Sequence, residues 1–256
     1  MNIFEGKTAV VIGGSGGIGL EISKILARNG ASLTIHGRDD KKLKKVSDEL
    51  QKQFNSNVKT VNLDLEKTDF LNIDSTLLNK FVSVADILCV CYGPFLQESV
   101  DQMTAQQWKD MSLLNYALPG FFVSSALKNM MNKKWGRILL FGGTGTSFRT
   151  EYKTNAAYAG AKSALGILVQ SVASNYADYG ITCNAIMPGF VDTEYIGPQQ
   201  KTELAKKMPG GKLIKEESVA SAAEFLLSNG DLNGVLLRLD RGLSANLGRN
   251  NALNLT

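Results

Sequence analysis

A run of glycines near the start of the chain, IGGSGGIG at residues 12–19, limits the possible folds more than any other feature. The run follows the apolar segment 8–12 and precedes a segment in which apolar residues recur with helical spacing. A helix that starts directly after a strand and a glycine loop offers free N–H groups and a partial positive charge to phosphates. This context predicts a loop that binds the pyrophosphate of a dinucleotide.

Three glycines of this run have separate roles in such a loop. Gly13 allows a tight turn, Gly17 lets the backbone approach a pyrophosphate, and Gly19 lets the helix pack close to the strand. Their spacing is wider than GxGxxG, and no Lys-Ser/Thr pair follows, so the sequence does not indicate a P-loop. We also assign Ser15 and Ile18 to the cofactor-binding loop.

Short apolar runs alternate with longer helical patterns along the whole chain. We predict strands at residues 8–12, 32–36, 58–63, 87–90, 138–141, 182–187 and 235–239. The longest helical patterns cover 104–132, where Pro119 predicts a kink, and 156–179. The alternation predicts a Rossmann-type α/β fold, a doubly wound parallel sheet of about seven strands with helices on both faces, formed by residues 1–256 as a single domain.

Composition excludes several classes of protein. A hydrophobic content of 44% with 20% charged residues is not that of a disordered chain. The net charge of +4 is scattered, and its densest cluster, residues 39–52, has the pattern of a solvated helix, so we expect no nucleic-acid partner. Without an apolar run of membrane-spanning length or a signal segment, and with three cysteines that suggest no disulfide framework, we expect a cytoplasmic protein. The one histidine, His36, leaves little basis for a metal site.

The end of the second predicted strand bears on which dinucleotide would bind. An acidic residue at this point holds the ribose hydroxyls of NAD and repels a 2′-phosphate. This chain has Gly37 there, followed by Arg38, whose planar cation suits a phosphate. The sequence therefore favours NADP(H) over NAD(H), with Ser15 as a further donor, unless Asp39 or Asp40 turns inward. Asp64, after the third strand, is predicted to contact the adenine amino group or to cap a helix.

Tyr158 and Lys162 lie four residues apart in YAGAK, and so on one face of a helix. A phenol can protonate the alkoxide that develops when hydride reaches a carbonyl, but its unperturbed pKa is about 10. A neighbouring ammonium group favours the phenolate and lowers that pKa. The pair therefore predicts a proton donor, Tyr158, with Lys162 as the group that tunes it and holds the ribose hydroxyls.

With these motifs together, the chain resembles the short-chain dehydrogenase/reductase family over nearly its whole length, most of all its 3-oxoacyl-carrier-protein reductases. The resemblance rests on the glycine loop, on YAGAK, on LLNYALPGFF and on MPGFVDTE. It implies that Asn115 supports a proton relay, that Gly93 lies close to the cofactor, and that four residues flank the nicotinamide: Pro188, Gly189, Val191 and Thr193. It also implies a homotetramer or homodimer.

Two departures from the family pattern stand out. The family usually has Asn-Asn-Ala-Gly after the fourth strand, whereas this chain has Val90, Cys91, Tyr92 and Gly93. The position of the carbonyl-polarising serine falls on Gly143, in a loop that is two residues longer than expected. We therefore assign the missing hydroxyl to Thr144, with Thr146 and Ser147 as neighbours.

The sequence thus predicts an NADPH-dependent reductase that converts a carbonyl substrate, either a 3-oxoacyl thioester or another ketone, to an alcohol. Two alternatives remain, a catalytically weakened cofactor-binding regulatory protein and an NAD-dependent alcohol dehydrogenase. The irregular stretch 190–213 is predicted to be a substrate lid. Phe148 and Tyr152 of the long loop are predicted to shape the substrate pocket, with Phe95 and Leu96 opposite.

Overall fold

A computed structural model of the chain describes residues 2–147, 149 and 151–246. Seven strands form one sheet: β1 (Thr8–Ile12), β2 (Ser32–Gly37), β3 (Val58–Asn62), β4 (Ile87–Val90), β5 (Gly136–Phe141), β6 (Ile181–Pro188) and β7 (Leu236–Leu239). Their order in the sheet is β3-β2-β1-β4-β5-β6-β7, and every neighbouring pair is parallel. The predicted doubly wound parallel sheet is confirmed.

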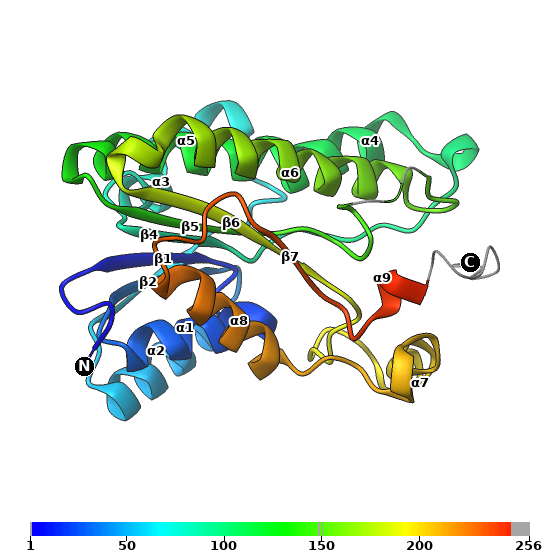
Figure 1. Cartoon of the computed structure of the whole chain (residues 1–256), viewed down its shortest axis with the longest axis horizontal. Helices are drawn as coiled ribbons and strands as arrows, with labels where there is room; N and C mark the ends of the chain where they lie inside the picture. Colours follow the sequence, from blue (N-terminus) through cyan, green and yellow to red (C-terminus); the bar gives the residue numbers. More distant parts are fainter. Residues whose placement is uncertain (1, 148, 150, 247–256) are drawn as a thin grey trace.

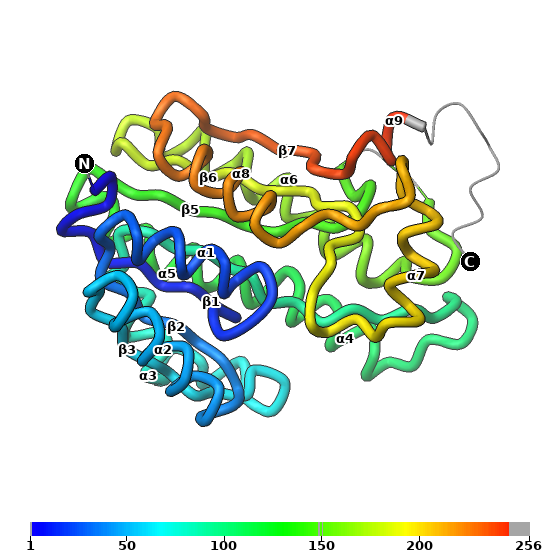
Figure 2. Tube along the Cα trace, turned by 90° about the horizontal axis from the view of Figure 1, so that it is seen from below, coloured from blue at the N-terminus to red at the C-terminus, as the bar shows by residue number. Residues whose placement is uncertain are grey.

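Helices cover both faces of this sheet (Figure 1). On one face lie α1 (Gly17–Arg28), α2 (Asp40–Phe54) and α8 (Glu216–Ser228). On the other lie α3 (Leu77–Val82), α4 (Ala105–Ser112), α5 (Leu118–Lys133) and α6 (Ala156–Tyr176). The short helices α7 (Pro198–Lys207) and α9 (Leu243–Asn246) lie together at one end of the molecule, beyond the sheet (Figures 1 and 2).

The strands bury both faces because their side chains alternate between two cores. In β1, Ala9 and Val11 belong to the core beneath α1, α2 and α8, whereas Val10 and Ile12 belong to the core beneath α3–α6. Fully apolar strands are typical of a sheet covered on both sides, which explains why the strands could be predicted from short apolar runs.

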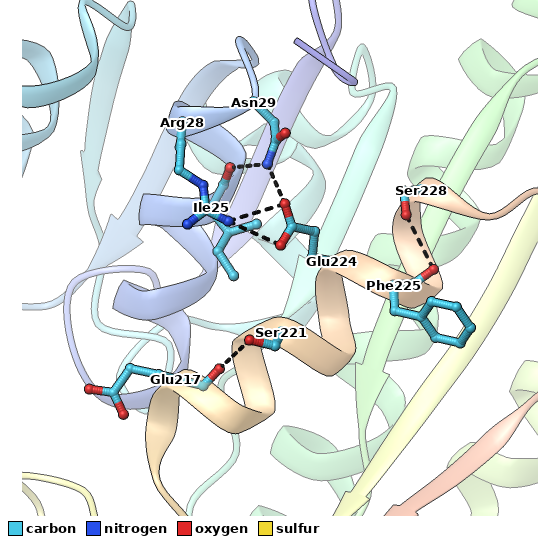
Figure 3. Close-up of polar contacts among 8 residues, drawn as sticks. All are labelled: Ile25, Arg28, Asn29, Glu217, Ser221, Glu224, Phe225 and Ser228. Atoms are coloured by element: carbon cyan, nitrogen blue, oxygen red, sulfur yellow. Dashed lines mark hydrogen bonds and ion pairs between the residues drawn. The ribbon is translucent and has the colours of Figure 1, made fainter. Parts of the chain in front are cut away.

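The α1–α8 pair closes the first of these cores at its outer rim (Figure 3). Glu224 of α8 accepts two hydrogen bonds from the Arg28 guanidinium, at 3.2 and 3.0 Å, and one from the Asn29 amide at 2.6 Å. Asn29 is the C-cap of α1, and Gly30 follows it with a φ of 87°, a left-handed conformation that glycine adopts readily at the end of a helix. One carboxylate therefore fixes the end of α1 against α8.

The long helical region between β4 and β5 differs from the prediction in how it is interrupted. A π-helical turn at Leu113–Ala117 separates α4 from α5, and Pro119 lies in the first turn of α5. The chain stays helical through this turn, so Pro119, which has no N–H to donate, lies directly beyond the point where the hydrogen-bond pattern widens. This turn contains Asn115, which the site requires.

Asp86 joins the start of β1 to the end of α5. Its carboxylate accepts 2.9 Å hydrogen bonds from the backbone N–H and the hydroxyl of Thr8, and pairs with Lys133 at 2.7 Å. Burial alone would raise the pKa of Asp86, but the bonds from Lys133 and Thr8 outweigh it and hold the pKa below its usual value. The charged form is therefore the one that stabilises the fold.

We expect Asp86→Asn to lower the free energy of unfolding at pH 7 by about 1–3 kcal/mol, the usual value of hydrogen bonds to a charged group. Because the folded-state pKa is depressed, this contribution is present above the unfolded-state pKa and is lost as the pH falls through the folded value. Urea unfolding at pH 7 and at pH 3 measures both effects. The exposed Asp74→Asn variant is the control, and an equal difference at both pH values would contradict the assignment.

Candidate functional site

The strand order reverses between β1 and β4, so the chain leaves these two neighbouring strands toward opposite halves of the sheet. Open α/β sheets bind their ligands at such a point, beyond the carboxyl ends of the strands. The glycine loop follows β1 there, and Gly93 follows β4.

The glycine loop has the close packing that its sequence predicts. A Cβ atom on Gly19 would collide with the carbonyl oxygen of Gly13, so only glycine lets α1 begin this near to the loop. The N-cap of α1 is Gly16, which has no side chain to occupy the N–H groups of the first turn. The loop therefore fits an anionic group such as a pyrophosphate.

His36 fixes this loop from β2, a contact that the sequence analysis did not predict. The N–H of Gly13 donates to its Nδ1 at 3.2 Å, and its Nε2 lies 2.9 Å from the carbonyl oxygen of Leu63. Burial lowers the pKa of His36, so the ring stays neutral and can accept at one nitrogen while donating at the other. The one histidine of the chain thus holds the start of the phosphate loop in place.

A cavity of about 560 Å³ lies where β2 and β3 end, and its walls are formed by Arg38, Asp39, Asp40, Lys41, Asp64 and Lys67. The Arg38 side chain is 68% exposed and lies 3.6 Å from Glu66. The Asp39 carboxylate caps α2 by accepting from the N–H of Lys42. Asp64 accepts from the N–H of Glu66 and pairs with Lys67. The cavity therefore presents the Arg38 cation together with Asp40, while Asp39 and Asp64 are engaged in bonds to neighbouring residues.

The predicted lid lies against the glycine loop. A Cβ atom on Gly16 would collide with the hydroxyl of Tyr195 and with the carboxylate of Glu194, and the Tyr195 ring lies 3.0 Å from the place that a Cβ on Gly17 would take. Lys42 holds both residues, since its ammonium group pairs with Glu194 at 2.5 Å and lies 5.3 Å from the centre of the Tyr195 ring. Glu194 and Tyr195 of the predicted lid thus lie against Gly16 and Gly17, which have no side chains to keep them away.

Helix α6 brings Tyr158 and Lys162 to the carboxyl ends of β4 and β5. The Lys162 ammonium group is buried and donates to the carbonyl oxygen of Phe141 at 3.0 Å. It lies 5.9 Å from the centre of the Tyr158 ring, and the ring of Phe95 packs edge-on against Tyr158 at 5.0 Å. The two residues predicted from YAGAK therefore face one site.

Asn115 reaches the same site from the π turn. A Cβ atom on Gly93 would lie 2.5 Å from its Oδ1 and 2.7 Å from the Nζ of Lys162, so the two side chains meet above Gly93. The amide nitrogen of Asn115 donates to the carbonyl oxygen of Pro94, whereas its buried Oδ1 has no partner among the described residues. Gly93 and Asn115 thus leave an acceptor open beside Lys162.

Burial decides the protonation of this pair. It lowers the pKa of Lys162 to about 8 and raises the pKa of Tyr158 to about 12, where Tyr152 adds to the effect. The direction for Tyr158 is opposite to the one expected from the lysine alone, because desolvation of the phenolate is the largest effect, and the Lys162 ammonium group donates to Phe141 instead. Tyr158 is therefore a protonated donor at neutral pH.

The loop after β5 places Gly143, and not a hydroxyl, beside Tyr158. A Cβ atom on Gly143 would lie 3.2 Å from the Oη of Tyr158. The hydroxyl of Thr144 donates to the carbonyl oxygen of Pro188 at 3.1 Å, which differs from the role predicted for it. Thr146 is buried and bonds through its hydroxyl to the N–H and the carbonyl of Gly143, at 3.0 and 2.9 Å.

The segment predicted to flank a nicotinamide runs along the carboxyl end of β6. Pro188 ends this strand, and the N–H of Gly189 donates to Leu239 of β7. Val191 is buried and pairs with Ile214 across the predicted lid, and the N–H of Thr193 donates to Val191. These residues connect the sheet to Tyr195 and so to the glycine loop.

Comparison with known proteins identifies the family. The model of the short chain dehydrogenase family matches residues 7–204. This chain belongs to the short-chain dehydrogenases.

It is 31% identical to an uncharacterized oxidoreductase, YmfI, of Bacillus subtilis over 233 residues, which are 87% of this chain and 91% of the relative. It is also 31% identical to the 3-oxoacyl-[acyl-carrier-protein] reductase FabG of Salmonella typhimurium over 232 residues, with 88% and 91% covered. A crystal structure described as a putative NAD(P)-dependent gluconate 5-dehydrogenase from Beutenbergia cavernae, with bound NADP, superposes with a TM-score of 0.83 at 26% identity and covers 94% of this chain and 98% of its own.

As a short-chain dehydrogenase, the protein has a Rossmann fold and is an NAD(P)-dependent oxidoreductase. None of its described helices is long and apolar enough to cross a membrane. In the part of the chain that the structure describes, no three His, Cys, Asp or Glu side chains are grouped to hold a metal ion. Phe148, one of the predicted pocket residues, lies outside the described residues.

We expect Lys42→Ala to loosen the predicted lid, because the lysine bonds to both Glu194 and Tyr195. Trypsin should then cleave within residues 198–212 several-fold faster than in the unaltered protein, as a local opening with little buried apolar surface is cheap. Lys44→Ala removes the same charge from an exposed position on α2 and should leave the cleavage rate unchanged. Equal rates for Lys42→Ala and the unaltered protein would show that the pair does not hold the segment.

Proposed function

We propose that this protein reduces a carbonyl substrate, a 3-oxoacyl thioester or another ketone, to the alcohol with NADPH. The observation that carries the proposal is the meeting of Lys162 and Asn115 above Gly93, with the Tyr158 ring 5.9 Å from the Lys162 ammonium group, at the carboxyl edge where the strand order reverses. Conversion of a carbonyl group to an alcohol, or the reverse, needs a side chain that gives a proton to the oxygen atom or takes one from it.

Each member of this group has a distinct task in the proposed reaction. When bound on the glycine loop and beside Lys162, the cofactor would supply the hydride that the carbonyl carbon receives. Tyr158 gives its phenolic proton to the carbonyl oxygen, and Lys162 stabilises the phenolate left behind and holds the ribose hydroxyls. The Oδ1 of Asn115, which has no partner among the described residues, lies beside Lys162 and supports the return of a proton to Lys162 and Tyr158 after each turnover.

NADP(H) is favoured over NAD(H) by the electrostatics of the cavity after β2. Arg38 is exposed there, Ser15 contacts Gly37, and Asp39 is engaged as the cap of α2. A related structure is described with bound NADP, and the FabG relative is named as an acyl-carrier-protein reductase. Both fit an NADPH-dependent reductase that acts on a small-molecule carbonyl compound or acyl thioester. The proposal includes a cytoplasmic homotetramer or homodimer, as the family resemblance implies.

The lid contact bears on cofactor binding. Gly17 is the position where the backbone admits a pyrophosphate, and the Tyr195 ring covers it. Glu194 and Glu216 add two carboxylates near the same turn. A dinucleotide laid on this loop therefore displaces Tyr195, so that residues 190–213 act as a lid over the cofactor and the substrate.

The alternative of a catalytically weakened regulatory protein is favoured by one feature, Gly143 beside Tyr158. It predicts NADPH binding without turnover. The second alternative, an NAD-dependent alcohol dehydrogenase, predicts a preference for NAD that the exposed Arg38 side chain does not favour.

The reductase proposal is tested with purified protein, NADPH and a panel of 3-oxoacyl thioesters, quinones and ketosteroids. We expect NADPH oxidation with at least one compound and a loss of about 10²-fold or more in kcat for Tyr158→Phe, as general acid catalysis contributes that much. The dissociation constant for NADPH, from fluorescence titration, should change little. Full activity of Tyr158→Phe would refute the mechanism, and binding without turnover would favour the regulatory protein.

We expect Arg38→Ala to weaken NADPH binding by about ten- to a hundredfold, because it removes a charge-assisted contact of about 1.5–3 kcal/mol to the 2′-phosphate. NADH has no 2′-phosphate, so its binding should remain nearly unchanged. Lys41→Ala, next to it along the same cavity, is the matched control for the loss of one positive charge. Titrations of both cofactors provide the measurement. An equal effect on NADPH and NADH would remove the argument for a 2′-phosphate contact.

A further inference from the structure

The loop after β5 poses a chemical problem for the proposed reduction. The carbonyl oxygen of a substrate gains negative charge as hydride arrives, and a second hydrogen-bond donor beside the proton donor stabilises it. Gly143 supplies no side chain at the point nearest to the Tyr158 hydroxyl. The donor must therefore come from another residue near the turn 143–145.

Two nearby threonines are already engaged. Thr144 donates its only hydroxyl proton to Pro188, a contact that ties the loop to the end of β6. The Thr146 hydroxyl is buried beneath Gly143, where it accepts from the N–H of that residue and lies 2.9 Å from its carbonyl oxygen. The Thr144 bond joins the loop to another strand, and the Thr146 hydroxyl is buried with bonds to both backbone groups of Gly143, so turning either hydroxyl to a substrate would release the loop from that contact. The bond of Tyr152, in contrast, joins two residues of the same loop.

Tyr152 reaches the same turn with a hydroxyl group. Its Oη donates to the carbonyl oxygen of Thr144 at 3.1 Å and lies 3.2 Å from the place that a Cβ on Gly145 would take. Tyr158 touches the turn at its other end, since its Oη lies 3.2 Å from the corresponding place on Gly143. Two phenols from separate segments therefore lie on one three-residue turn.

We propose that Tyr152 is a catalytic residue that donates a hydrogen bond to the substrate carbonyl oxygen, in the role that a serine side chain at position 143 would have. The proposal rests on the reductase function proposed above. In the reaction, the hydride and its electron pair go to the carbonyl carbon, the carbonyl π electrons go to the oxygen, and the proton comes from Tyr158. Tyr152 keeps its own proton and only exchanges the Thr144 carbonyl for the substrate oxygen as its acceptor.

The surroundings of Tyr152 fit a donor that stays protonated. Burial raises its pKa to about 12, and the same phenol raises the pKa of Tyr158 further. The Arg149 guanidinium lies 5.0 Å from the centre of the Tyr152 ring, and its buried Nη1 has no partner in the described part of the chain. A cation over the ring makes the phenol a stronger hydrogen-bond donor.

The test compares Tyr152→Phe, Gly143→Ser and the double variant, with the substrate of the panel that the unaltered protein turns over best. Tyr152→Phe should lower kcat by about 10²–10³-fold, the usual cost of one such donor, with little change in KM or in the NADPH dissociation constant. Gly143→Ser places a hydroxyl beside Tyr158, so the double variant should recover at least tenfold of the lost kcat. A purely structural role of the Tyr152–Thr144 bond would not be restored in this way.

Tyr179→Phe, which removes a phenolic hydroxyl from an exposed position outside the site, is the matched control and should keep kcat within a few-fold of the unaltered protein. Unchanged kcat in Tyr152→Phe would overturn the proposal, as would a larger loss in Thr144→Val or Ser147→Ala, the variants that remove the competing hydroxyls. If Gly143→Ser is inactive by itself because its Cβ crowds Thr146 at 3.2 Å, the kcat and KM of Tyr152→Phe still decide.

Failure of this proposal can be told apart from failure of the proposed function. If Tyr158→Phe abolishes turnover and Tyr152→Phe does not alter it, the reductase stands and Tyr152 is not the donor. If Tyr158→Phe keeps its activity, or no compound is reduced by the unaltered protein, the reductase function itself fails and Tyr152 has no carbonyl to polarise.

Discussion

The candidate site depends on one buried ammonium group. Lys162 donates to the last carbonyl of β5, and this bond fixes the position of α6 relative to the sheet. An isolated buried cation is costly, so the residues around it are constrained: Gly93 has to lack a side chain, and Asn115 presents its free acceptor from a π turn. Tyr158 follows from the same helix, one turn away. The residues proposed for catalysis are thus arranged by the need to accommodate one charge.

A second constraint orders the cofactor side of the sheet. His36, held neutral by burial, accepts the N–H of Gly13 and so determines where the glycine loop leaves β1. The next residue of β2 is Gly37, against which Ser15 packs, and Arg38 follows at the rim of the cavity. The end of β2 therefore shapes the phosphate loop and also presents the side chain proposed to select NADP(H).

How much of this could be predicted from the sequence depends on whether each contact is local. The strands, α1 with Gly30 after its end, and the Tyr158–Lys162 pair follow from spacing along a few residues, and the family resemblance added Gly93 and Asn115. The contact of Lys42 with Glu194 joins residues 152 positions apart, and no pattern along the chain indicates it. The hydroxyl of Thr144 could not be oriented in advance, because that depends on how a lengthened loop meets β6.

The loop after β5 contacts Pro188, two residues before the start of the predicted lid. The hydroxyl of Thr144 donates to the carbonyl oxygen of Pro188. Further along the chain, within the predicted lid, the ring of Tyr195 lies over Gly17 of the glycine loop. Tyr152 and Tyr158 both lie on the turn 143–145, which the Thr144 bond joins to Pro188. The two phenols and the segment that leads to Tyr195 are therefore attached to the same end of β6.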